Sequence, residues 1–165
     1  MLKTINTYFF FLVLINNFSD AQPSQEIIRI KQNPLKVVDG DTIHIGKTKY
    51  RLHGIDAPEV QQKCERLNKI YSCGKEAKEY LRSLIKSKER VKCQKKAVDK
   101  YKRTIAVCYY NKENLNKLMV RNGWAIAYRK YSKDYVDDEY YAKENKLGMW
   151  EGFFVNPYEW RKKNR

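Results

Sequence analysis

The sequence lacks the patterns of several common classes of protein. It has 2 histidines, 4 cysteines and no Cys-x-x-Cys pair, which disfavours a zinc site. Its acidic residues do not take the spacing of an EF-hand loop. Beyond the N-terminal region no apolar run is long enough to span a bilayer, and no repeat or linker divides the chain. The 165 residues therefore predict one soluble domain with a substantial core.

The N-terminus has the pattern of a secretory signal peptide. An apolar run, Tyr8–Ile15, is followed by Ser19 and Ala21, the small residues of a cleavage site. We expect residues 1–21 to be removed and residues 22–165 to form the mature, secreted or periplasmic domain. An uncleaved membrane anchor is the alternative, but the run is too short for it, so we expect no stable membrane insertion after cleavage.

Export makes the four cysteines interpretable as disulfides. Three pairings are possible, and the local arrangement favours Cys64–Cys73, closing one loop, and Cys93–Cys108, linking neighbouring strands. A hairpin that turns at residues 100–101 would place Cys93 opposite Cys108. A zinc site is the weaker alternative.

The chain is strongly basic, with a formal net charge of +15. Such a charge favours an anionic partner: nucleic acid, an anionic membrane surface or an acidic polysaccharide. A Lys- and Asn-rich composition can also reflect base bias in the coding DNA. That bias does not explain acids concentrated in one short region of a basic chain.

The acids gather around a predicted β-hairpin. Two apolar segments flank a turn signal at Gly46-Lys47 and carry four carboxylates and one arginine. These residues are Asp39, Asp41, Arg51, Asp56 and Glu59. Clustered carboxylates repel one another unless a cation neutralises them, and oxygen ligands favour calcium. The alternative is a hairpin with ordinary solvated turn acids.

Apolar periodicity predicts the elements of the mature chain. Strands are expected at Ile27–Ile30, Leu35–Asp39, Asp41–Ile45, Lys49–Gly54, Arg90–Gln94 and Arg103–Tyr110. Helices are expected at Lys75–Lys86, Asn111–Arg121 and Lys133–Lys146. The segment Val60–Ser72 is expected to be a loop, Trp150–Tyr158 an ordered aromatic tail, and Trp160–Lys163 a frayed basic end.

This order of elements predicts an α+β, mainly β protein. It favours a five-stranded OB-fold barrel with three α-helices, although another α+β layout has the same periodicity. The second helix is expected to turn Leu118 and Met119 inward, and the third helix is expected to bury Tyr140.

Three short motifs follow one another between Pro34 and Trp150. They are Val38-Asp39-Gly40-Asp41-Thr42, Arg51-Leu52-x-x-Ile55-Asp56-x-Pro58-Glu59 and Asp99-Lys100-Tyr101-x-Arg103. Together, and in this order, they closely resemble the staphylococcal-nuclease-like (thermonuclease) family. The resemblance implies an OB-fold barrel with three helices, and a calcium-dependent phosphodiesterase that cuts DNA and RNA.

The resemblance also implies a ligand set for one Ca²⁺ ion. Asp41 and Asp56 would be its carboxylate ligands, and Ala57 would offer its backbone carbonyl. Ala57 stands where the family's best-known member has threonine, a change that a backbone ligand tolerates. Asp39 would act from outside the direct ligands, through a bridging water.

For the substrate, the resemblance implies that Arg51 and Arg103 grip the scissile phosphate. Glu59 would be the general base, or would position the attacking water. The third motif often has glycine where this chain has Lys102. If that turn needs a positive φ, Lys102 is strained by about 1 kcal/mol, unless it adds a phosphate contact.

Further candidates are less specific. Tyr128 and Tyr131 resemble the tyrosines that flank the family's nucleotide pocket, although tyrosines are often core residues. His53 could act as a base, but a packed or surface histidine is the favoured interpretation, and His44 has no evident partner.

The sequence thus predicts a secreted, monomeric, calcium-dependent endonuclease that cleaves DNA and RNA with low sequence specificity. One alternative is a catalytically silent OB-fold module that binds nucleic acid or another polyanion. Another is a cationic surface-adhesion protein whose acids are only turn residues. Every carboxylate and arginine of the three motifs is present, which argues against a silent module.

Overall fold

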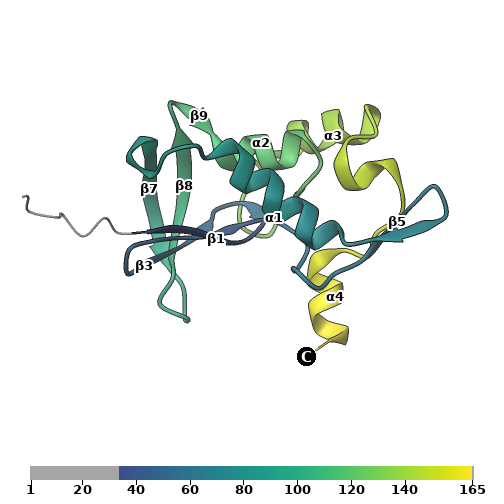
Figure 1. Ribbon diagram of the computed structural model, residues 1–165, viewed down its shortest axis with the longest axis horizontal. Helices are drawn as coiled ribbons and strands as arrows, with labels where there is room; N and C mark the ends of the chain where they lie inside the picture. Colours follow the sequence, from purple (N-terminus) through teal and green to yellow (C-terminus); the bar gives the residue numbers. More distant parts are fainter. Residues whose placement is uncertain (1–33, 165) are drawn as a thin grey trace, which may run out of the picture. The chain divides into compact units, whose positions relative to one another are not determined.

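A computed structural model describes residues 34–164 (Figure 1). The predicted signal peptide and the predicted strand Ile27–Ile30 lie outside the described residues. Within residues 34–164, none of the helices has the length and apolar character that crossing a membrane would require.

The core of the fold is a mixed sheet that has the predicted α+β, mainly β character. Its strands run in the order β1-β2-β3-β8-β7, and the short β9 pairs with β8. The bounds are β1 Leu35–Asp39, β2 Thr42–Ile45, β3 Thr48–Leu52, β7 Val91–Val98, β8 Thr104–Tyr110 and β9 Glu113–Asn114. All neighbours are antiparallel except β3 and β8, which are parallel.

Four α-helices accompany the sheet in the described residues, one more than predicted. They are α1 Cys73–Leu84, α2 Leu115–Arg121, α3 Val136–Glu144 and α4 Pro157–Lys163. Two 3₁₀ turns, η1 Lys88–Arg90 and η2 Gly148–Glu151, complete the helical elements. In Figure 1, α1 lies across β1, against which it packs.

The C-terminal residues form α4, so the prediction of a frayed end is wrong. Asn156 accepts a hydrogen bond from the backbone N–H of Tyr158 at 2.9 Å, and Pro157 occupies the first turn. An Asn cap followed by proline is a typical start of a helix. The cap residues Asn156 and Pro157 can be read from the sequence, but the seven residues of α4 are too few to show a helical apolar periodicity.

The segment Val60–Ser72 is also more regular than predicted. It contains a small hairpin, β5 (Cys64–Arg66) and β6 (Lys69–Tyr71), instead of a loop. Leu67 and Asn68 turn the chain with φ values of 51° and 59°. The strands are only three residues long, too short to give a readable alternation.

Helices α2 and α3 start later than predicted. Asn111 and Lys112 have φ values of 51° and 81°, which no helix allows. The helix α2 starts after Asn114, whose side chain accepts a hydrogen bond from Lys117 N at 3.0 Å. The helix α3 likewise begins only after Tyr135.

The core contains most of the predicted apolar residues. The largest fully buried apolar side chains are Ile43, Leu52, Ile55, Leu81, Leu115, Met119, Val120 and Met149. Each such burial contributes about 1.5–3 kcal/mol to folding. Leu118 is only half-buried. Tyr140 is 56% exposed, so the expectation that it faces the core is wrong.

The buried face of α3 carries a charged residue instead of Tyr140. Glu139 accepts hydrogen bonds from Arg129 Nη2 at 2.7 Å, Lys143 Nζ at 3.0 Å and the N–H of Ala127 at 3.1 Å. Burial alone would raise the pKa of Glu139, but these hydrogen bonds outweigh burial and lower its pKa below the ordinary value.

Two disulfides are present, and they are the pairs that the sequence favoured. Cys64 and Cys73 close the β5–β6 hairpin onto the start of α1. Cys93 and Cys108 face each other across β7 and β8, in the predicted register. The described residues contain no free cysteine.

Candidate active site

The first acids of the site lie on a sharp turn between β1 and β2. The pairing register shifts between Val37 and Asp39, and the N–H of Asp41 donates to Asp39 Oδ1 at 3.0 Å. A Cβ on Gly40 would lie 2.7 Å from the Cβ of Ala57. Gly40 therefore allows the turn to approach Ala57, whose N–H donates to Asp41 Oδ2 at 2.8 Å.

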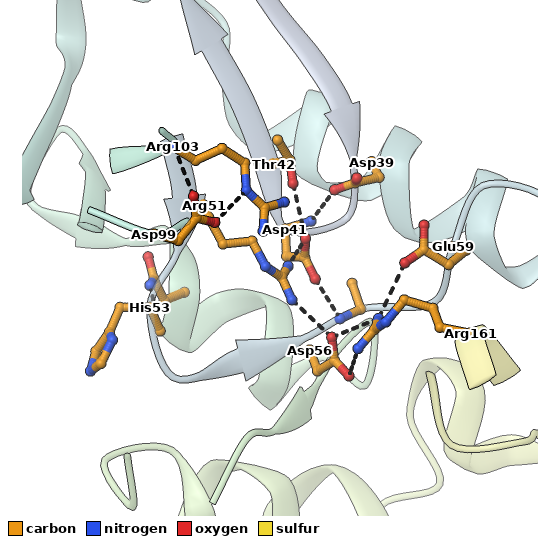
Figure 2. Close-up of polar contacts among 12 residues, drawn as sticks. Asp39, Asp41, Thr42, Arg51, His53, Asp56, Glu59, Asp99, Arg103 and Arg161 are labelled. Carbon is orange, nitrogen blue, oxygen red and sulfur yellow. Dashed lines mark hydrogen bonds and ion pairs between the residues drawn. The ribbon is translucent and has the colours of Figure 1, made fainter. Parts of the chain in front are cut away.

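Arg51 joins two buried carboxylates that lie far apart in the sequence. It comes from β3, and Asp56 comes from the short strand β4 (Ile55–Asp56), which pairs with β10 (Ile126–Ala127). Arg51 Nη2 donates to Asp56 Oδ1 at 2.8 Å, and Nη1 forms an ion pair with Asp41 (Figure 2). Asp41 is 5% exposed and Asp56 0%.

Backbone packing holds Glu59 at the edge of this cluster. A Cβ on Gly74, in the first turn of α1, would lie 1.7 Å from the carbonyl oxygen of Glu59. Only glycine lets α1 sit this close. The same carbonyl accepts a hydrogen bond from the N–H of Gln62 at 2.8 Å. The main chain of Glu59 is thereby fixed while its carboxylate reaches the site.

Arg103 is held by the turn between β7 and β8. Asp99 accepts hydrogen bonds from the N–H groups of Tyr101 and Arg103, both at 2.9 Å, and from Arg103 Nε at 2.7 Å. Burial raises the pKa of Asp99, but the hydrogen bonds from Arg103 outweigh it and hold the pKa below the ordinary value. Lys102 has a φ of 61°, so the turn does need a positive φ.

Sequence reasoning missed Arg161, a residue of α4. Its Nη1 donates to Asp56 Oδ1 at 3.0 Å and to Glu59 Oε1 at 3.2 Å, and its Nη2 donates to Asp56 Oδ2 at 2.8 Å. Figure 2 shows this side chain entering the cluster beside Glu59. The excess of clustered acids over arginines is the signal that could have pointed to a further cation.

The remaining predicted residues differ in their proximity to this cluster. Asp39 is close to it, and burial raises the pKa of its carboxyl against the opposing charge of Arg51. Figure 2 shows His53 directed away from the carboxylates. Tyr128 and Asp56 line one cleft of about 720 Å³. The Tyr131 ring meets the Tyr128 ring edge-on at 4.8 Å but is 59% exposed.

The chemistry of the buried donors fits a hard divalent cation. Residues 34–164 contain no group of three or more acidic, histidine or cysteine side chains arranged to hold a metal. The oxygens of Asp41 and Asp56 are nonetheless the ligand type that calcium prefers. In this structure Arg51 and Arg161 neutralise the two carboxylates.

Comparison with known proteins gives consistent matches. A sequence model of the family described as staphylococcal nuclease homologue matches residues 49–152. An uncharacterised endonuclease of Haemophilus influenzae is 34% identical over 139 residues, covering 79% of this chain and 72% of the relative. The micrococcal nuclease of Shigella flexneri is 31% identical, covering 79% and 80%. The thermonuclease of Staphylococcus hyicus is 31% identical, covering 70% and 73%.

Proposed function

The chain belongs to the staphylococcal nuclease family, and from this premise we propose that it is a calcium-dependent endonuclease that cuts DNA and RNA with little sequence preference. Membership of the family makes it a hydrolase of phosphodiester bonds. The observation that carries the proposal is the placement of Arg51 between buried Asp41 and Asp56, with Glu59 at the edge of the same cluster.

Arg51 and Arg103 bind the scissile phosphate. Attack on a phosphodiester adds negative charge to its oxygens, and a guanidinium offers forked donors that match this geometry. The hydrogen bonds of Asp99 fix the backbone and the Nε edge of Arg103, which limits the rotamers that the side chain can take. Removing one such contact typically costs about 3 kcal/mol at the transition state, roughly a hundredfold in rate.

Asp41, Asp56 and the carbonyl of Ala57 would hold the calcium ion, and Asp39 would support it through a bridging water. When bound, the ion supplies Lewis-acid polarisation of the phosphate. Glu59 takes the proton of the attacking water or holds that water in line. The fixed main chain of Glu59 suits either task, because it restricts the positions that the carboxylate can take in the site.

The polymer is attracted by the net charge of +15, so binding weakens as salt rises. Tyr128, on the wall of the cleft beside Asp56, offers a ring for an unstacked base. Tyr131 packs on that ring from the solvent side and supports it.

The same proposal includes export of a monomeric enzyme. Residues 1–21 are the signal peptide and residues 22–165 the mature domain. The two disulfides support this assignment, because such bonds persist outside the reducing cytosol.

The test is cleavage of single-stranded DNA by the purified mature protein, with calcium and with a chelator. We expect cleavage only with calcium. Glu59→Gln should lower kcat by about 10²–10⁴-fold while leaving DNA binding in chelator unchanged. Glu79→Gln is the matched control, because Glu79 is exposed on α1 and, within residues 34–164, its ion pair is the local one with Arg82.

Two results would contradict the proposal. Binding without cleavage in either condition, by folded protein, would favour the silent OB-fold module instead. Cleavage by Glu59→Gln at the wild-type rate would remove Glu59 from the mechanism and leave the family assignment intact.

A further inference from the structure

Arg161 is placed as a counter-ion inside the cluster, although α4 lies beyond the residues that the family's sequence model matches. Its side chain is 21% exposed and makes two ion pairs, one with Asp56 and one with Glu59. Asp56 is fully buried, so an unpaired charge there would be strongly unfavourable. Arg161 is therefore an integral part of the site as it stands.

The hydrogen bonds of Asp56 leave little room for another partner. A carboxylate has about four lone-pair sites. Oδ1 of Asp56 accepts from both Arg51 and Arg161, and Oδ2 accepts from Arg161. A cation that uses Asp56 as a ligand must therefore compete with the Arg161 guanidinium, which already donates hydrogen bonds to both carboxylate oxygens.

We propose that Arg161 is an internal competitor of the calcium ion. It neutralises Asp56 and Glu59 while the site holds no metal, it releases Asp56 when calcium binds, and it thereby sets the calcium affinity of the enzyme. This inference rests on the proposed function, because it takes Asp56 as a calcium ligand.

Charge and geometry both support competition. A guanidinium and a divalent cation on one carboxylate repel each other strongly in a buried site. The two ion pairs made by Arg161 differ in burial: Asp56 is inaccessible, whereas the side chain of Glu59 is 34% exposed. Glu59 can therefore be hydrated when Arg161 moves. Arg51 bridges Asp41 and Asp56 from a strand of the sheet, whereas Arg161 reaches Asp56 from α4, outside the sheet.

The decisive experiment is a calcium titration by calorimetry without substrate. Arg161→Ala should bind calcium about tenfold more tightly than the wild type, because the competitor is gone. Lys162→Ala is the matched control. It removes the same charge from the same helix, but Lys162 pairs with Glu159 at 3.5 Å, whereas the side-chain partners of Asp56 within residues 34–164 are Arg51 and Arg161. Its calcium affinity should change less than about twofold.

Thermal unfolding separates competition from a merely structural role. In chelator, Arg161→Ala should melt below the wild type, because buried Asp56 has lost a partner. At saturating calcium the difference should largely disappear, since the ion replaces the lost charge. A structural arginine would lower both melting temperatures equally. Arg161→Lys keeps the positive charge but loses the forked pair of guanidinium donors that binds both oxygens of Asp56. Its calcium affinity should therefore lie between those of the wild type and Arg161→Ala.

Unchanged or weaker calcium binding by both Arg161 variants would overturn the inference. If the wild type still bound calcium and cut DNA in that case, the proposed function would stand. If neither the wild type nor the variants bound calcium, the inference and the calcium-dependent mechanism would fail together.

Discussion

Lys102→Gly should stabilise the protein, even though the substitution removes a whole side chain. Lys102 has a φ of 61°, and an L-residue in this region is strained by about 1–2 kcal/mol. Glycine relieves the strain but makes the unfolded chain more flexible, which costs about 0.5–1 kcal/mol. The side chain is exposed, so no packing is lost. The difference between these two ranges is about 0–1.5 kcal/mol, and their midpoints give a net gain of about 0.75 kcal/mol.

Urea denaturation of both proteins at neutral pH measures this difference. The midpoint should rise with an unchanged m-value, and the melting temperature should rise by about 2–4 °C. Lys100→Gly is the control, because Lys100 lies in the same turn without a positive φ. It should destabilise by about 0.5–1 kcal/mol.

If Lys102→Gly destabilised the protein as much as Lys100→Gly does, the strain argument would be refuted.

The KM for DNA answers a separate question. It should stay unchanged, because the hydrogen bonds that hold Arg103 come from Asp99 and do not involve the Lys102 side chain. A raised KM would show that Lys102 contacts the phosphate backbone.

Three further predictions concern stability. Glu139→Gln should cost about 2 kcal/mol at pH 7 in urea unfolding. Folding lowers the pKa of Glu139, so its ionised carboxylate stabilises the folded protein at pH values above the unfolded-state pKa. This stabilisation is lost as the pH falls through the folded-state pKa. The unfolding free energies of the wild type and of Glu139→Gln should therefore converge in acid. Replacing Cys93 and Cys108 together by alanine opens a loop of sequence separation 15 and should cost about 3 kcal/mol. Gly40→Ala should cost about 2 kcal/mol and weaken calcium binding measured by calorimetry, because the new Cβ would push against Ala57; unaltered stability would contradict the close approach.

The sheet and the motif residues could be predicted because their signals are local. Alternation predicted β8 and the first half of β7, although β7 runs on to Val98, and the predicted turn brought Cys93 opposite Cys108. A glycine between two strand residues is typical of a kink or bulge, and the pairing register shifts beside Gly40. Each of these features depends on residues that are near neighbours in the chain or in one hairpin.

The failures have a different origin. The helical spacing of Val136 and Tyr140 predicts Tyr140 in the core, whereas α3 buries Glu139, whose charge is satisfied by partners that no periodicity reveals. The short basic stretch Trp160–Lys163 predicts a frayed end, and nothing in it indicates that Arg161 reaches a buried carboxylate. Its partners, Asp56 and Glu59, lie more than a hundred positions earlier.

That separation has a consequence for the order of folding. Arg161 and Asp56 are 105 positions apart, so their contact closes one of the longest loops in the domain. Loops of this size form late, after local helices and hairpins. During refolding the sheet should therefore regain its structure before the cluster gains its last cation. For that interval the chain is a nearly native sheet around poorly neutralised acids. By the proposed competition, a dissolved divalent cation that occupies Asp56 should slow the docking of Arg161.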